Sequence, residues 1–109
     1  MNRCNRPLEV VLITSNAKKI QPHDFIVRND WQKIKNKYNH GNIQYINADK
    51  ASTSTYIRNP ILSESNYPMV VISDISGRNI GMPRRYLTDI KRNQLTYDTL
   101  SNKINSYCN

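Results

Sequence analysis

The run Val10-Val11-Leu12-Ile13 constrains the fold of this chain more than any other feature. It is rich in β-branched residues, and it is too short to cross a bilayer. A continuous apolar run of this length is typical of a strand that is buried on both faces. The sequence therefore predicts a strand over residues 9–14. A second run of the same kind, Met69-Val70-Val71-Ile72, predicts another buried strand.

The first expected helix follows a polar break after residue 14. Its apolar residues recur at helical spacing and define one face: Val27, Trp31, Ile34 and Tyr38. Asn29 or Asp30 is a candidate N-cap, and Gly41 stands where a C-terminal glycine stop belongs. The sequence therefore predicts a helix that ends before Gly41.

The middle of the chain contains weaker signals. A second short strand is expected over residues 42–47, and at most one or two helical turns over residues 49–57. Turn residues at 74–78 predict a hairpin whose return strand covers residues 79–82. The basic stretch 83–93 is expected to be irregular.

The last helix is the best marked. Thr96 is a suitable N-cap, and Leu95 with Leu100 forms a hydrophobic staple. The inward face of this helix is expected to carry Tyr97, Leu100, Ile104 and Tyr107. With 109 residues the chain forms one domain, here assigned to residues 9–109, after a polar N-terminal arm over residues 1–8.

Several pieces of this order match one known family. Residues 43–49 (IQYINAD), Tyr67-Pro68 before a buried strand, the turn Ser76-Gly77-Arg78, and Leu95-Thr96 with Leu100 resemble segments of the thioredoxin-like family. The resemblance covers residues 8–107. It implies an α/β fold: a three-layer sandwich with a mixed four-stranded sheet in the order β-α-β-(α)-β-β-α. It also implies a cis bond before Pro68 and a right-handed crossover between two parallel strands.

The chain departs from this family where the family's redox cysteines stand. After the first strand, residues 14–20 read TSNAKKI and contain no cysteine. Thiol–disulfide exchange requires a thiolate, so the resemblance implies the fold without the family's activity. We therefore expect no enzyme activity at this site, no cofactor and no catalytic or metal-binding residues.

The two cysteines, Cys4 and Cys108, lie near opposite ends of the chain. They form no Cys-x-x-Cys pair, and with only His23 and His40 they form no zinc pattern. A disulfide between them requires that the two ends meet. We favour two unpaired thiols in a reducing compartment, with a redox role for Cys4 or Cys108 as a minor alternative.

Two surfaces are candidates for binding a partner. In the thioredoxin-like family the residue before the cis-proline offers its backbone to an extended peptide. The resemblance therefore implies a protein-docking groove at Tyr67 and Pro68, beside Lys18 and Lys19. The second surface is a basic cluster that suits phosphates or an acidic partner: Arg78, Arg84, Arg85, Lys91 and Arg92.

The net charge of +8 is compatible with an acidic protein partner or with nucleic acid. No nucleic-acid-binding motif accompanies the basic cluster. We expect a non-catalytic adaptor or structural component of a larger assembly, with nucleic-acid binding as the alternative. The many Asn, Ile, Lys and Tyr residues suggest an AT-rich genome, which favours a minor virion protein of a large DNA virus. No apolar signal core or membrane span is evident, so an intracellular or virion location without membrane insertion is expected.

Overall fold

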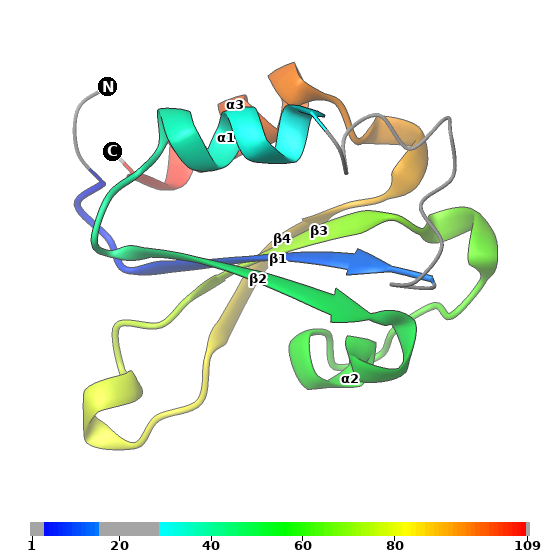
Figure 1. Cartoon of the computed structure of the whole chain (residues 1–109). Helices are drawn as coiled ribbons and strands as arrows, with labels where there is room; N and C mark the ends of the chain where they lie inside the picture. The colour runs from blue at the N-terminus through cyan, green and yellow to red at the C-terminus, as the bar shows by residue number, and fades with distance from the viewer. Residues whose placement is uncertain (1–3, 16–28, 109) are drawn as a thin grey trace.

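The structure is a computed structural model that describes residues 4–15 and 29–108 (Figure 1). It contains four strands, namely β1 (Leu8–Thr14), β2 (Ile43–Asp49), β3 (Met69–Asp74) and β4 (Arg85–Ile90). The α-helices are α1 (Trp31–Lys37), α2 (Thr53–Tyr56) and α3 (Tyr97–Cys108), and the short 3-10 helices are η2 (Lys50–Ser52), η3 (Glu64–Asn66), η4 (Arg78–Ile80) and η5 (Arg92–Gln94). The chain is therefore a mixed α/β protein, as expected.

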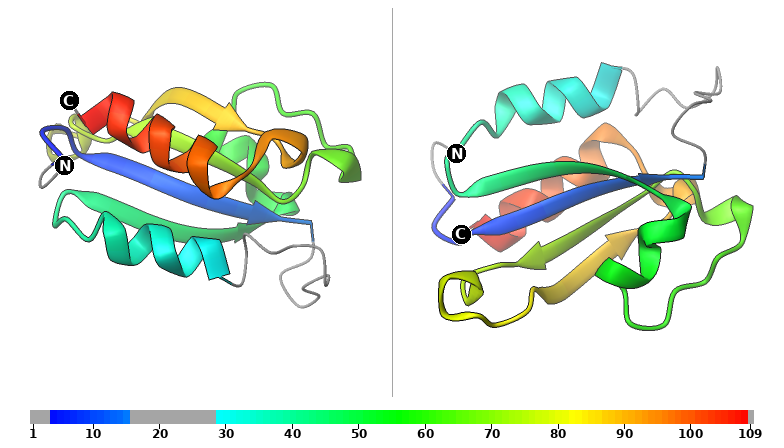
Figure 2. Two further views of the ribbon diagram at one scale, coloured as in Figure 1. Left: turned by 90° about the horizontal axis from the view of Figure 1, so that it is seen from above. Right: turned by 60° about the horizontal axis from the view of Figure 1, so that its bottom comes forward.

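The four strands form one mixed sheet in the order β2-β1-β3-β4. The central strand β1 runs parallel to β2 and antiparallel to β3, and β3 runs antiparallel to β4. The two apolar runs of the sequence thus occupy the two central strands, where both faces are covered. Helices α1 and α3 lie on one face of the sheet, and α2 lies on the other (Figures 1 and 2).

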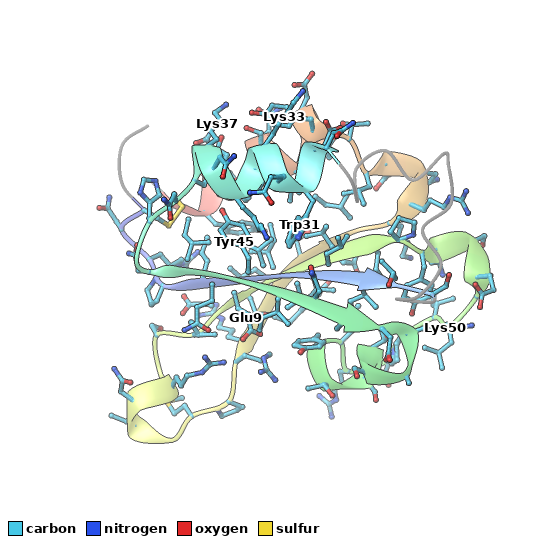
Figure 3. The ribbon with its side chains drawn as sticks, in the orientation of Figure 1. Glu9, Trp31, Lys33, Lys37, Tyr45 and Lys50 are labelled. Carbon is cyan, nitrogen blue, oxygen red and sulfur yellow. A yellow bond between two sulfur atoms is a disulfide. The ribbon has the colours of Figure 1, made fainter. Side chains whose placement is uncertain are left out.

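The larger part of the core lies between the sheet and the helices α1 and α3. Alternate residues of β1 point into it, beginning with Leu8 and Val10. Trp31 packs edge-on against Tyr45 with 5.5 Å between ring centroids (Figure 3). The other buried members include Leu12, Ile34, Tyr38, Ile43, Val70, Ile72, Ile90, Leu100 and Ile104. The predicted helical faces therefore supply this core, apart from Val27, which lies outside the described residues.

A smaller core lies on the α2 face. It consists of Val11, Ile13, Tyr67, Met69 and Val71, with Tyr56 and Ile57 packed against it. These residues cover the half of the sheet near the carboxyl end of β1. The other half of this face, near the amino end of β1, carries Glu9 in place of an apolar residue.

Helix α3 begins as the sequence predicts. The Thr96 hydroxyl accepts a hydrogen bond from the backbone N–H of Thr99, with 3.1 Å between the two atoms. Leu100 and Ile104 are fully buried, while Tyr97 and Tyr107 pack at the edge of the core. The cap and the inward face of this helix are confirmed.

The predicted return strand over residues 79–82 is wrong. Residues 78–80 form the 3-10 helix η4, Gly81 has a positive φ of 79°, and the strand β4 lies further on, within the stretch expected to be irregular. The turn closes on itself because the Met82 N–H donates to the Gly77 carbonyl oxygen at 3.0 Å. A Cβ on Gly77 would lie 2.8 Å from the Met82 Cβ, so this turn requires glycine there.

The expectation of two unpaired thiols is also wrong. Cys4 and Cys108, 104 residues apart, form a disulfide, and both residues are buried. The segment before β1 lies against the last turn of α3, where the Asn5 N–H donates to the Cys108 carbonyl oxygen at 3.1 Å. The two ends of the domain therefore meet at the end of the sheet where β1 begins.

Candidate functional site

The most unusual charged group of the structure is Glu9, which is 0% exposed on the central strand β1. Arg78 Nη2 donates to its Oε2 at 2.8 Å, and Arg84 Nε donates to its Oε1 at 2.6 Å. A carboxylate is costly to bury unless it is paired and hydrogen-bonded. Here each of its oxygens accepts a charge-assisted hydrogen bond from a different arginine. Glu9 therefore binds two residues that the sequence assigned to partner contacts.

Both arginines also contact other elements. Arg78 Nη1 donates to the side-chain oxygen of Gln44 on β2 at 2.9 Å. The Arg84 guanidinium lies 4.8 Å from the ring centroid of Tyr56 on α2, within the range of a cation–π contact. The loop that connects β3 to β4 is thus attached to β1, β2 and α2. It extends below the sheet on the same side as α2 (Figure 1).

A second carboxylate, Asp74, lies at the same end of the sheet as Glu9. Asp74 is the register partner of Leu8, so its side chain lies on the opposite face of the sheet from Glu9. The Ser76 N–H donates to its Oδ1 at 2.7 Å, and Arg6 Nε lies 3.0 Å from its Oδ2. Arg85 is its partner in the β3–β4 register. Hydrogen bonds from Ser76, followed by the charges of Arg6 and Arg85, hold the pKa of Asp74 below its usual value, although burial opposes this shift.

At the amino end of β1, each of the two carboxylates therefore has two arginines nearby: Arg78 and Arg84 at Glu9 on one face of the sheet, and Arg6 and Arg85 at Asp74 on the other. Two positive charges remain in excess. The side chains of Arg78 and Arg84 are 45% and 27% exposed, so solvent or a partner can reach them. This part of the surface can therefore attract anionic groups.

The other two basic candidates, Lys91 and Arg92, lie apart from this group. They follow the carboxyl end of β4, while Arg84 and Arg85 stand at its amino end. The six residues of β4 span about 20 Å at the rise of a strand. The five basic residues singled out in the sequence thus form two separate groups.

Two of the four residues of the expected docking groove, Tyr67 and Pro68, lie directly before β3. The Tyr67-Pro68 bond is cis, as the resemblance implies, and both residues are buried. The Tyr67 hydroxyl lies 3.0 Å from Thr53 Oγ1 on α2, which holds the ring against the sheet. Lys18 and Lys19 lie outside the described residues. A small hollow of about 60 Å³ adjoins this region, lined in part by Met69, Asp89 and Lys91.

Sequence reasoning missed Glu9 and its partners. The signal was present, because Glu9 interrupts the apolar sequence LEVVLI at the start of the first predicted buried strand. A glutamate at a fully buried position needs a cationic partner. The sequence does not indicate which of sixteen basic residues supplies it, since Arg78 and Arg84 are 69 and 75 residues away.

The described residues form neither a metal-binding cluster nor a membrane-spanning helix. Within residues 4–15 and 29–108, no three His, Cys, Asp or Glu side chains gather closely enough to hold a metal ion. No helix in this part of the chain is long and apolar enough to cross a membrane. Comparison of the chain with protein-family models, with curated proteins and with solved structures gives no match.

Proposed function

We propose that this chain is a thioredoxin-like domain that binds a protein partner, as an adaptor or structural component of a larger assembly, and performs no thiol chemistry. The sheet order β2-β1-β3-β4, with a parallel first pair and an antiparallel hairpin, supports the likeness. The placement of α1 and α3 on one face and α2 on the other supports it as well (Figure 2).

The position of the disulfide carries this proposal. In the thioredoxin-like family the reactive cysteines follow the carboxyl end of the first strand. Here both cysteines of the sequence stand beside the amino end of β1, where they are buried and bonded to each other. Such cysteines serve to join the two ends of the domain, because a reactive thiol must be exposed to its substrate.

The alternative of a redox protein that uses Cys4 or Cys108 can be tested directly. We expect the chain to reduce insulin disulfides no faster than dithiothreitol alone. The control is Cys4→Ser with Cys108→Ser, which should give the same rate. An acceleration that the double variant abolishes would contradict the proposal.

The contact function needs a test in the native source. We expect a tagged chain, purified under mild conditions, to retain a protein partner at fixed stoichiometry after nuclease treatment. A partner that nuclease removes would favour the nucleic-acid alternative. The separation of Arg84 and Arg85 from Lys91 and Arg92 counts against that alternative, because no single basic track joins the two groups.

A further inference from the structure

We propose that the arginine loop, defined as residues 75–84 with the adjoining Arg85 and Tyr86, binds an extended partner segment that contains both carboxylates and apolar side chains. The inference rests on the proposed contact function and names its surface and the chemistry of its partner. Three properties of the loop support it: fixed conformation, exposed apolar groups and excess positive charge.

The loop is held in one conformation. Backbone hydrogen bonds close it at Ile75–Arg78, Gly77–Ile80, Arg78–Gly81 and Gly77–Met82. Arg78 within the loop and Arg84 at its end bind the same buried carboxylate of Glu9, which lies beneath the sheet beside the loop (Figure 3). A binding loop that is already ordered loses less conformational entropy on association.

This ordered loop nevertheless exposes apolar side chains. Ile80 is 78% exposed, Met82 is 59% exposed, and Tyr86 at the start of β4 is 47% exposed. Among the described residues the other large exposed apolar side chains are Ile61 and Leu62, near η3. Three of these five residues thus lie within seven positions of one loop. Clustered exposed apolar groups mark contact surfaces, whereas single ones do not.

The charge of the loop specifies the partner further. A guanidinium has five N–H donors. Arg78 and Arg84 each direct two nitrogen atoms to groups within the chain, which leaves donors on both for an external acceptor. The nearby carboxylates Glu9 and Asp74 are already paired with arginines. A partner's carboxylates would therefore complement this surface, in the bidentate geometry that arginine favours.

The position of β4 favours an extended peptide over a lipid surface. It is one of the two edge strands of the sheet, and within residues 4–15 and 29–108 it pairs with β3 alone. Its outer edge can form backbone hydrogen bonds with an added strand, which a membrane cannot supply. An extended segment along this edge would pass Tyr86 and the arginine loop, and its alternate side chains would face the same surface.

The test is a selection of random 12-residue peptides displayed on phage against the folded full-length chain, followed by affinity measurements on synthetic copies. We expect the selected peptides to be enriched in Asp or Glu together with Leu, Ile or Phe. Their affinity should fall at least tenfold in the variant Ile80→Ser with Met82→Ser. The matched control, Ile61→Ser with Leu62→Ser, removes the exposed apolar pair near η3 and should change the affinity less than twofold.

Other results would overturn the inference. These are a failure to select any peptide, the selection of peptides without acidic residues, and an equal loss of affinity in the two double variants. A further outcome is that no peptide is selected but the chain binds phosphatidylserine vesicles. If the double variant Ile80→Ser, Met82→Ser abolishes that binding, the loop contacts a membrane surface instead. Circular dichroism of each variant confirms that it is folded.

The proposed function can fail separately. If the chain retains its native partner at unchanged stoichiometry in the Ile80→Ser, Met82→Ser variant, the contact function stands and the loop is not its surface. If no protein partner accompanies the wild-type chain, the contact function itself is wrong.

Discussion

Arg84 Nε lies 2.6 Å from Oε1 of Glu9, and this contact joins the first strand of the sheet to a loop 75 residues later. Glu9 is fully buried, whereas its two arginines are partly exposed. The arginines therefore supply the compensating charge that the Glu9 carboxylate cannot obtain from water. The arginines, in contrast, can be hydrated without Glu9. This asymmetry determines what substitutions at the cluster should do.

Removing the arginines should destabilise the fold more than removing the carboxylate. Arg78→Ala with Arg84→Ala leaves a buried charge without a partner, and we expect a loss of about 3–5 kcal/mol in the free energy of unfolding. Glu9→Gln leaves two arginines that solvent can reach, and we expect a loss of about 1–3 kcal/mol. Urea unfolding measures both.

The exposed pair Lys50–Glu64, with 2.9 Å between Nζ and Oε1, provides the control. Lys50→Ala should cost less than about 1 kcal/mol, because surface ion pairs contribute little. If Glu9→Gln proved as costly as the double arginine substitution, the proposed asymmetry would be incorrect.

The disulfide should contribute strongly to stability. It closes a loop with a sequence separation of 104, and the chain-entropy relation gives about 4–5 kcal/mol for a loop of that size. We expect dithiothreitol to lower the midpoint of guanidinium unfolding markedly. Cys4→Ala with Cys108→Ala should show the same lowered midpoint, and dithiothreitol should not lower it further. A reduced chain as stable as the oxidised chain would contradict this expectation.

Stability should fall at acid pH partly through Asp74. Its pKa lies below the usual value of 3.8 in the folded chain, so the unfolded state binds a proton more readily than the folded state. The contribution of Asp74 is therefore fully present above about pH 4–5, and it is lost as the pH falls through the folded pKa. Asp74→Asn should flatten the dependence of unfolding free energy on pH below 4. If the pH dependence of the unfolding free energy were the same in this variant and in the wild type, Asp74 would not contribute to the loss of stability in acid.

Nucleic-acid binding should be weak and nonspecific. Arg78 and Arg84 hold Glu9, and Lys91 and Arg92 lie at the far end of β4. We expect dissociation constants for short DNA duplexes no tighter than about 10⁻⁶ M at physiological salt, without sequence preference. If the chain instead bound DNA at nanomolar concentration, and the double variant Arg84→Ala, Arg85→Ala bound it tenfold more weakly, the nucleic-acid alternative would be favoured over the proposed function.

The parts of the fold that sequence reasoning predicted are those with a local signal. The strands β1 and β3 contain continuous apolar runs, and α3 is preceded by a residue with a capping side chain. Strand β4 was missed because an edge strand carries polar and charged residues, here RYLTDI, that also suit an irregular stretch.

The candidate site depends on long-range pairing, which a single sequence does not reveal. The basic character of Arg78, Arg84 and Arg85 could be predicted, but their relation to Glu9 and Asp74 could not. The disulfide was missed for the same reason, because nothing local indicates that Cys4 and Cys108 meet. Both relations join residues that are far apart in the sequence and meet only in the folded chain.

The most direct test of the contact function is the mass in solution of the chain isolated from its native source, measured by light scattering. If the contact function is correct, the mass is well above the 12.7 kDa of the single chain, with a protein partner at constant ratio across the peak. A 12.7 kDa species without a partner, at physiological salt and at the native concentration, would contradict it.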